Sequence, residues 1–313
     1  MSKIELYQTA PAVKELPARQ TDIEKRLQTL IEENMETFFG VRFLATEYTT
    51  SNGGRIDSLG LDENNLPTIF EYKRSISENV INQGLFYLDW LLDHKADFRE
   101  LARDKLGSAA AKEIDSSSPR LICIAAEFTR YDSYAVNQID KNIDLIRYRL
   151  FDNDLILFEQ VHSNTSAEKK NSVSGTPITS RTPKTAPSSS SSKISNNHKT
   201  FAERKAVMDP EIHTLLEAAA DYIRSLGDDI TEQEKKHYLA FKKIKNFACI
   251  RVTNKEVTLY LKLNPDEHLL EAGFTRDVQN IGHQGTGDLE VLISDWPSFE
   301  KAKPLIQESY RRG

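Results

Sequence analysis

Two short stretches decide the fold of the first half of this chain: Gly53–Leu61, GGRIDSLGL, and Thr68–Ser75, TIFEYKRS. Both are rich in aliphatic and aromatic residues and follow turn residues, which indicates two neighbouring strands. Side chains alternate faces along a strand, so Ile69, Glu71 and Lys73 are expected on one face. A polar pair at that spacing is unusual in a strand otherwise built for burial.

The register of this hairpin brings a second carboxylate to the same face. A turn centred on Asn64 places Asp57 directly opposite Glu71, and opposite residues of an antiparallel pair point the same way. A slip of one residue would send Asp57 to the other face. The sequence therefore predicts Asp57, Glu71 and Lys73 on one patch of sheet.

The chemistry of this patch favours a divalent cation. Two adjacent carboxylates repel each other unless a cation lies between them, and hard oxygen ligands with open water positions suit Mg²⁺ or Mn²⁺. The predicted ligands are Asp57, Glu71 and the main-chain carbonyl of Tyr72. Lys73 would then orient or deprotonate an attacking water, or stabilise charge in the transition state. The prediction is a site for phosphodiester hydrolysis.

The surrounding pattern predicts an α/β unit with a mixed sheet flanked by helices. A helix carrying Ile23 to Met35 comes first, then three strands, two helices, the buried strand Leu121–Phe128, a further helix and two closing strands. The three early strands are Val41–Thr49, Arg55–Leu61 and Thr68–Arg74, and the two helices lie at about 78–94 and 96–106. Glu24 lies on the first helix and Gln83 on the helix after the third strand, where both can reach the same end of the sheet.

At this point the sequence resembles the PD-(D/E)XK nuclease superfamily, in the branch of the mismatch- and branched-DNA endonucleases. The resemblance covers about residues 20–160 and rests on GRID, EYKR and the trailing Gln83. It implies a restriction-endonuclease-like fold in which Glu24, Asp57 and Glu71 surround the metal. It further implies that Lys73 is catalytic and that Gln83 assists.

Charge and composition divide the chain into three parts. The 313 residues carry a net charge of −6, which separates into −8 for residues 1–162, +5 for 163–200 and −3 for 201–313. The middle part is rich in Ser, Thr, Pro and Lys and has almost nothing to bury, so it is predicted to be a disordered linker. The expected domains are therefore a nuclease-like domain at 1–162 and a second domain at 201–313.

The second domain reads as a smaller α+β unit. Helices are predicted at about 209–226, 231–239 and 297–310, with strands FACIRVT, VTLYLKL and LEVLISD between them. The stretch around GHQGTGDLEV resembles the C-terminal module of bacterial proteins of unknown function, some of them labelled predicted transport proteins. His283 and Asp288 within it are candidate ligand-binding residues, although the stretch lacks the Lys and the helix of a phosphate-binding P-loop.

Basic residues in both parts are candidates for phosphate contacts with nucleic acid. For each of them, ordinary salt bridging or a strand junction with buried aromatics is the alternative. The candidates are Arg55, Arg74, Lys242, Lys243 and Lys245.

Several common functions are excluded by what the sequence lacks. It has no HExxH, no paired CxxC, no Ser-His-Asp or Cys-His arrangement, no strand-linked GxGxxG and no apolar run of 18 residues. Cys123 and Cys249 lie in separate apolar runs and read as reduced core residues of a cytoplasmic protein.

The expected function is a Mg²⁺- or Mn²⁺-dependent deoxyribonuclease acting in DNA repair or in defence against foreign DNA. DNA is the expected partner, no membrane is expected, and a homodimer stays open. Two alternatives remain: a non-catalytic nucleic-acid- or protein-binding module on the same fold, and a transport-associated regulator.

Overall fold

The computed structural model describes residues 4–19, 24–73, 79–164 and 199–313. They form two compact units, the first built from residues up to 164 with 243–245, and the second from 199–242 and 246–313. The predicted linker 163–200 lies almost wholly outside the described residues. No helix among those residues is long and apolar enough to cross a membrane.

The N-terminal unit is a mixed sheet flanked by helices, as the sequence predicts. Its strands lie in the order β3-β8-β7-β6-β5-β4, and β9 pairs with β8. Pairing is antiparallel among β4, β5 and β6, parallel from β6 through β7 to β8, and antiparallel again between β8 and β9. Its elements are β1 (Leu6–Gln8), β2 (Lys14–Leu16), β3 (Ala18–Arg19), α1 (Glu24–Glu33), α2 (Met35–Phe39), β4 (Val41–Thr49), β5 (Arg55–Asp62), β6 (Pro67–Lys73), α3 (Asn79–Asp93), α4 (Lys95–Lys112), β7 (Arg120–Ala125), α5 (Arg130–Asn137), β8 (Asn142–Phe151) and β9 (Leu155–Asn164).

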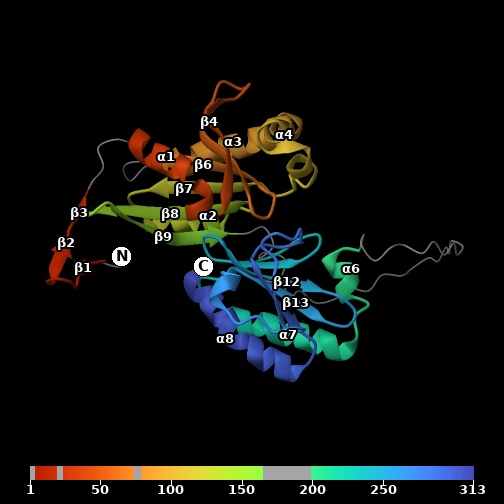
Figure 1. Ribbon diagram of the computed structural model, residues 1–313. Coiled ribbons are helices and arrows are strands. Elements are labelled where there is room, and N and C mark those ends of the chain that lie inside the picture. The colour runs from red at the N-terminus through yellow and green to blue at the C-terminus, as the bar shows by residue number, and fades with distance from the viewer. Residues whose placement is uncertain (1–3, 20–23, 74–78, 165–198) are drawn as a thin grey trace, which may run out of the picture. The chain divides into compact units, whose positions relative to one another are not determined.

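Two apolar cores, one on each face of the sheet, hold this unit together. Ile69 of β6 packs with the apolar side of α3 and α4, whereas Phe70 and Tyr72 pack with α1 and α2 on the opposite face. Figure 1 shows α3 and α4 together on one side of the central strands. The strict alternation along β6 therefore places Glu71 and Lys73 on the α3 side, as predicted.

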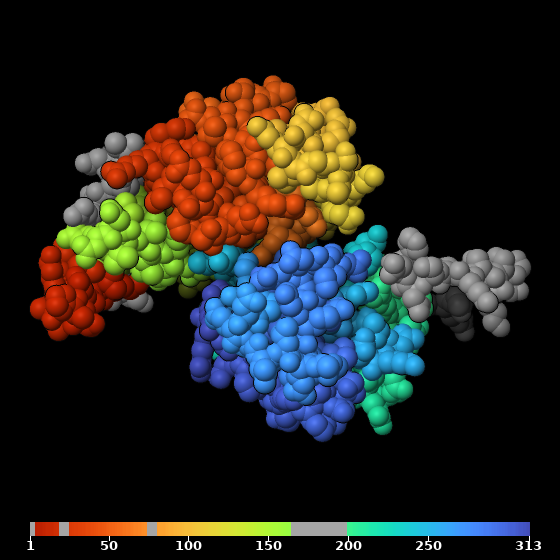
Figure 2. All heavy atoms as spheres, viewed as in Figure 1, coloured from red at the N-terminus to blue at the C-terminus, as the bar shows by residue number. Residues whose placement is uncertain are grey.

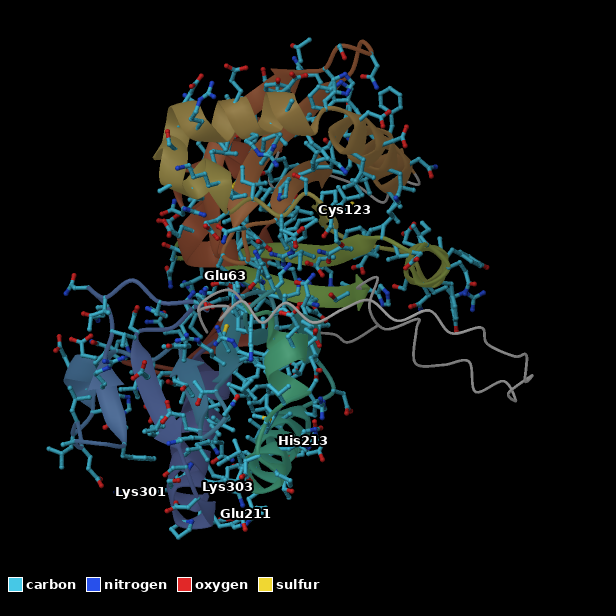
Figure 3. The ribbon with its side chains drawn as sticks, turned by 90° about the vertical axis from the view of Figure 1, so that its right-hand side faces the viewer. Glu63, Cys123, Glu211, His213, Lys301 and Lys303 are labelled. Atoms are coloured by element: carbon cyan, nitrogen blue, oxygen red, sulfur yellow. The ribbon has the colours of Figure 1, made fainter. Side chains whose placement is uncertain are left out.

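The central strand β7 is buried along its whole length, because helices cover both faces of the sheet. Cys123, labelled in Figure 3, lies within it as a buried thiol, Cys249 is also buried, and no disulfide joins the two. Burial raises the pKa of the Cys123 thiol well above its usual value. Both cysteines are thus core residues, in agreement with the sequence.

Figure 2 shows the early strands and α4 of this unit forming a continuous surface on the face in view.

The C-terminal unit is an antiparallel sheet with helices on one face. Its strands lie in the order β10-β11-β12-β13-β15-β14, and α7 and α8 pack together against one side of them (Figure 1). The elements are α6 (Phe201–Lys205), α7 (Pro210–Arg224), β10 (Thr231–Glu234), β11 (Leu239–Lys242), β12 (Asn246–Val252), β13 (Val257–Leu261), the 3₁₀ turn η3 (Pro265–Glu267), β14 (Thr275–Asp277), β15 (Leu289–Ile293) and α8 (Trp296–Arg312).

One predicted helix of this unit is wrong. The stretch from Thr231 to Leu239 forms strand β10 and the turn to β11, with Glu232 opposite Phe241. Thr231 and Gln233 are buried while Glu234 is exposed, which is the period of two expected of a half-buried strand. Its Glu, Gln and Lys residues favour a helix in isolation, but pairing with β11 overrides that preference. The short strands β1, β2, β3, β11 and β14 were also not predicted from the sequence.

Candidate active site

The hairpin of β5 and β6 has the register that the sequence predicts. Ser58 pairs with Phe70 and Leu59 with Ile69, so Asp57 stands opposite Glu71 at the next position. The regular ladder ends there, because side-chain contacts replace the main-chain pairing. The main-chain N–H of Asp57 donates to Glu71 Oε1 at 3.3 Å, and the N–H of Tyr72 donates to Asp57 Oδ2 at 3.0 Å. The two carboxylates therefore meet across the hairpin.

Burial makes the charge of this pair costly. Glu71 is fully buried and Asp57 is half-buried. Desolvation and the charge of Asp57 raise the pKa of Glu71 to about 9, although the charge of Lys73 opposes the shift. Desolvation also raises the pKa of Asp57, against the hydrogen bond from Tyr72 and the charge of Lys73. Both shifts favour a pair that shares a proton over a pair with two charges.

One atom of the pair lacks a partner. Glu71 Oε2 is buried and accepts no hydrogen bond from an N–H or O–H donor of the described part of the chain, although the carboxyl groups of Glu71 and Asp57 lie within hydrogen-bonding reach of each other. A buried carboxylate oxygen without a donor is rare in proteins, and an ion is one of the groups that commonly satisfies it. This atom, Asp57 and the carbonyl of Tyr72 make a hard-oxygen donor set, which fits a divalent cation that keeps several waters. The N–H of Tyr72 faces β5, and a residue's N–H and C=O point to the same side of a strand, so its carbonyl faces Asp57 as well.

A network on the opposite face holds Asp57 in place. The buried amide of Gln28 on α1 donates to the carbonyl of Asp57 at 2.9 Å and to Glu32 Oε1 at 2.8 Å. Ser58 Oγ donates to the same Glu32 oxygen at 2.6 Å, and it accepts from the hydroxyl of Tyr72 at 3.1 Å. Helix α1 is thereby tied to both strands of the hairpin at the position of the carboxylates.

The amide of Gln83 approaches the start of β5 through Tyr87. Gln83 Nε2 donates to the Tyr87 hydroxyl at 3.3 Å, and this hydroxyl accepts the main-chain N–H of Arg55 at 3.1 Å. Gly54 makes the approach feasible, because a Cβ there would lie 2.5 Å from the Tyr87 ring. Gly84 lets α3 pack closely on β7, since its Cβ would lie 2.5 Å from Leu121. Helix α3 is thus fixed next to the start of β5, where Arg55 lies two residues before the predicted metal ligand Asp57.

The remaining candidate residues of the N-terminal unit are Arg55, Glu24 and Arg74. Arg55 lies 3.7 Å from Glu47, which also binds Lys25 at 2.7 Å, so this part of the surface is an ion-pair cluster. The side chains of Glu24 and Arg74 lie outside the described residues. No group of three or more His, Cys, Asp or Glu side chains that could hold a metal occurs among the residues described. The described donor set therefore consists of two carboxylates and one carbonyl.

The candidates from the second half of the sequence lie in turns and at strand ends. Lys242 ends β11 and is buried, while Lys243 and Lys245 belong to the turn that follows, where the N–H of Lys243 donates to the carbonyl of Lys245 at 3.0 Å. His283 stacks on the ring of Tyr260 with centroids 4.5 Å apart. The described residues show no hydrogen bond or ion pair between His283 and Asp288.

The glycines of the GHQGTGD stretch explain its sequence as a tight crossing over the sheet. Gly285 has φ 112° and a Cβ there would lie 3.0 Å from Cys249. Gly287 has φ 129° and its Cβ would lie 2.7 Å from the main chain of Leu261. Only glycine meets both demands. The stretch is therefore a constrained turn before β15.

Sequence reasoning missed Gln28, Glu32 and Ser58. Gln28 and Glu32 are four residues apart and so lie on the same face of a helix, next to the apolar stripe of Leu27 and Ile31. Two polar residues at that spacing along the edge of an apolar stripe were the available signal. What they bind depends on the tertiary fold and has no local signature.

Comparisons with known proteins gave one family match in the C-terminal part and one curated relative along most of the chain. Residues 197–312 match a family model described as "Domain of unknown function (DUF5655)". This match confirms the expectation of a domain of unknown function in the C-terminal part. Over 301 residues the chain is 29% identical to an uncharacterised protein of Haemophilus influenzae, covering 95% of this chain and 96% of that protein.

Three solved structures show remote similarity. A repair endonuclease from Pyrococcus abyssi is 14% identical over 46% of this chain and 61% of its own, with a TM-score of 0.28. EndoMS in its apo form is 19% identical over 43% of this chain and 49% of its own, with a TM-score of 0.27. EndoMS in a complex with double-stranded DNA is 17% identical over 46% of this chain and 59% of its own, with a TM-score of 0.25. This chain thus spans between 49% and 61% of the length of these solved chains.

Proposed function

We propose that the N-terminal unit is a deoxyribonuclease that depends on Mg²⁺ or Mn²⁺ and hydrolyses DNA phosphodiester bonds. The observation that carries the proposal is the unpartnered, fully buried Glu71 Oε2 beside Asp57. An ion-pair network built for stability would satisfy that oxygen with a donor. A site that exchanges a proton for a metal ion leaves it open.

The metal would be held by Asp57, Glu71 and the carbonyl of Tyr72. Once bound, it supplies positive charge to the phosphate oxygens and lowers the pKa of a coordinated water. The hydrolysis adds the oxygen of water to phosphorus and breaks the bond to the leaving oxygen, which takes up a proton. The protein has to place the scissile phosphate beside the two carboxylates and keep the geometry fixed during this exchange.

Lys73 lies two residues beyond Glu71 on the same face of β6, and its charge acts on both carboxylates. Its ammonium is proposed to donate hydrogen bonds to the phosphate, where charge develops in the transition state. Gln28 and Glu32 are positioning residues, because they hold the main chain of Asp57 from the opposite face. Gln83 and Tyr87 fix α3 over the start of β5 and thereby form one side of the site.

A cleavage panel tests this proposal. Purified full-length protein is incubated with labelled single-stranded, duplex, flapped and mismatched DNA in the presence of Mg²⁺, Mn²⁺ or EDTA. We expect cleavage of at least one substrate with either metal and none with EDTA. Retarded DNA without cleavage on every substrate would instead favour a non-catalytic binding module. Cleavage that persists in EDTA would contradict the metal dependence.

A further inference from the structure

The C-terminal unit has a polar surface on the face of its sheet opposite α7 and α8. Residues 248, 250 and 252 of β12 point toward the helices, so the alternate residues Cys249 and Arg251 point the other way. The register places Arg251 opposite Thr258 and Tyr260 opposite Glu290. These side chains therefore form one cross-strand surface on the face away from the helices.

Positive charge gathers at one side of this surface. A hollow of about 410 Å³ beside the turn between β12 and β13 is lined by Lys199, Arg204, Arg251 and Lys255, and among the described residues Glu256 is its one carboxylate. Four cations around one carboxylate is an arrangement that repels itself unless an anion is present. The hollow therefore has an excess of positive charge that a bound anion would offset.

The arginines confirm this imbalance. Arg204 is buried and donates to the carbonyl of Val252 at 3.3 Å. Desolvation and the nearby charge of Arg251 lower the pKa of Arg204. Arg251 Nε is buried and has no hydrogen-bond partner within the described part of the chain, while the guanidinium is also hydrogen-bonded to the Tyr260 hydroxyl. A guanidinium N–H that is buried and unused is costly, and a phosphate oxygen is the acceptor it matches best.

A second hollow adjoins the first. It measures about 350 Å³ and shares Arg251, Thr253 and Glu256 with its neighbour. Its own lining includes Tyr260, Phe274 and Leu292, together with the ion pair of Arg276 and Glu290 at 2.8 Å. Aromatic and aliphatic side chains beside carboxylate acceptors suit a flat ring that carries N–H donors. The two hollows together thus offer a cationic part and a ring-binding part.

We propose that this face binds a nucleoside phosphate, with the phosphate between Arg251, Arg204 and Lys255 and the base against Tyr260 and Phe274. The same chemistry is present in a free nucleotide and in the terminal nucleotide of a single strand. The inference stands on the C-terminal unit alone and does not depend on the proposed nuclease activity.

The test measures binding to full-length protein carrying Asp57→Asn, so that a nuclease activity cannot consume the probe. Calorimetric titrations use adenosine monophosphate, adenosine, inorganic phosphate and a 5′-phosphorylated pentadeoxynucleotide. We expect adenosine monophosphate to bind more tightly than inorganic phosphate or adenosine. A tighter oligonucleotide would identify the end of a strand as the source, and a tighter mononucleotide would identify the free compound. Both results support the site.

Variants locate the binding. Arg251→Gln is expected to weaken nucleotide binding about tenfold or more, since it removes a charge-assisted hydrogen bond. Lys255→Gln, at an exposed turn position, should weaken it several-fold and avoids any effect of Arg251 on folding. The matched control is Arg311→Gln, an exposed position on α8 that should leave affinity unchanged. Absence of saturable binding by the phosphate-bearing probes would overturn the proposal, as would equal weakening by the control. Adenosine monophosphate binding no tighter than phosphate would overturn the assignment of the second hollow.

Discussion

The main-chain N–H of Asp57 donates to Glu71 Oε1 at 3.3 Å, so the Glu71 carboxyl group, which is closed to solvent, lies against the strand that carries Asp57. The carboxyl groups of Asp57 and Glu71 interact directly, and two like charges this close in a buried place cannot both persist without a cation. Under the proposed function, the pair would therefore alternate between two states, one with a proton and one with a metal ion. Most of the behaviour expected of this protein follows from the exchange between them.

Metal affinity should depend steeply on pH. The pKa of Glu71 is about 9 in the metal-free protein, so binding a cation at lower pH must displace its proton. We expect the affinity for Mn²⁺ to rise about tenfold per pH unit between about pH 6 and 8, with about one proton released for each ion bound. Calorimetric titrations in two buffers of different ionisation enthalpy measure both quantities. An affinity independent of pH would contradict the proton-bearing state of Glu71.

The metal-free protein should gain stability when Glu71 loses its ability to ionise. A solvated glutamate has a pKa of 4.5, whereas the pKa of Glu71 is raised to about 9 in the folded protein. Between these values the folded state holds more protons than the unfolded state, so stability falls as pH rises through this window. Glu71→Gln is expected to raise the free energy of unfolding by about 1 kcal/mol or more at pH 8 and to give no gain near pH 4.

Thermal unfolding at both pH values, in EDTA, measures this effect. Glu33→Gln, at an exposed position of α1, is the matched control and should leave the free energy of unfolding unchanged at both pH values. A Glu71→Gln protein less stable than the wild type at pH 8 would show that the ionised carboxylate stabilises the fold.

Gln28 should matter for catalysis although it lies on the far face of the sheet. Its amide holds the carbonyl of Asp57 at 2.9 Å, and its removal leaves that buried carbonyl without this donor. Gln28→Ala is expected to cost about 1–3 kcal/mol of stability and to lower the cleavage rate at saturating DNA, with little change in DNA affinity. Thr29→Ala, on the exposed side of α1, controls for general effects on the helix. A loss of affinity with an unchanged rate would assign Gln28 to substrate binding.

Gly54 should be intolerant of any side chain. A Cβ at this position would lie 2.5 Å from the Tyr87 ring and 2.9 Å from Thr50 Oγ1. Gly54→Ala is expected to destabilise the protein by about 1–3 kcal/mol and to shift α3 away from the hairpin. Gly282→Ala is the control, because nothing lies within 4 Å of a Cβ there. Denaturant unfolding of the two variants compares them directly, and equal stability would contradict the close contact.

The sequence predicted the central hairpin well because local rules specify it. Alternation along β6 separates Glu71 from Phe70 and Tyr72, and the turn near Asn64 sets the register with Asp57. The buried run of β7 is equally clear, since a central parallel strand must be apolar on both faces. These features depend on neighbours within a few residues or on a single hairpin.

Other features depend on distant contacts and escaped prediction. Strand β10 consists of Thr231 to Glu234, whose residues favour helix, and it is a strand because it pairs with β11. The role of Gln28 comes from reaching the carbonyl of Asp57, 29 positions along the chain. The surface around Arg251 forms only when β12, β13 and β15 align their alternate residues.

The rate of Mg²⁺-dependent DNA cleavage by Asp57→Asn, measured beside wild type and the control Asp93→Asn, tests the central claim most directly. Asp57→Asn keeps the shape of the side chain and its acceptor for the N–H of Tyr72, but it removes the charge that would hold the metal. The account predicts a loss of about 10³-fold or more for Asp57→Asn with an unchanged melting temperature, and wild-type activity for Asp93→Asn at the exposed end of α3. Cleavage by a folded Asp57→Asn protein at the wild-type rate would contradict it.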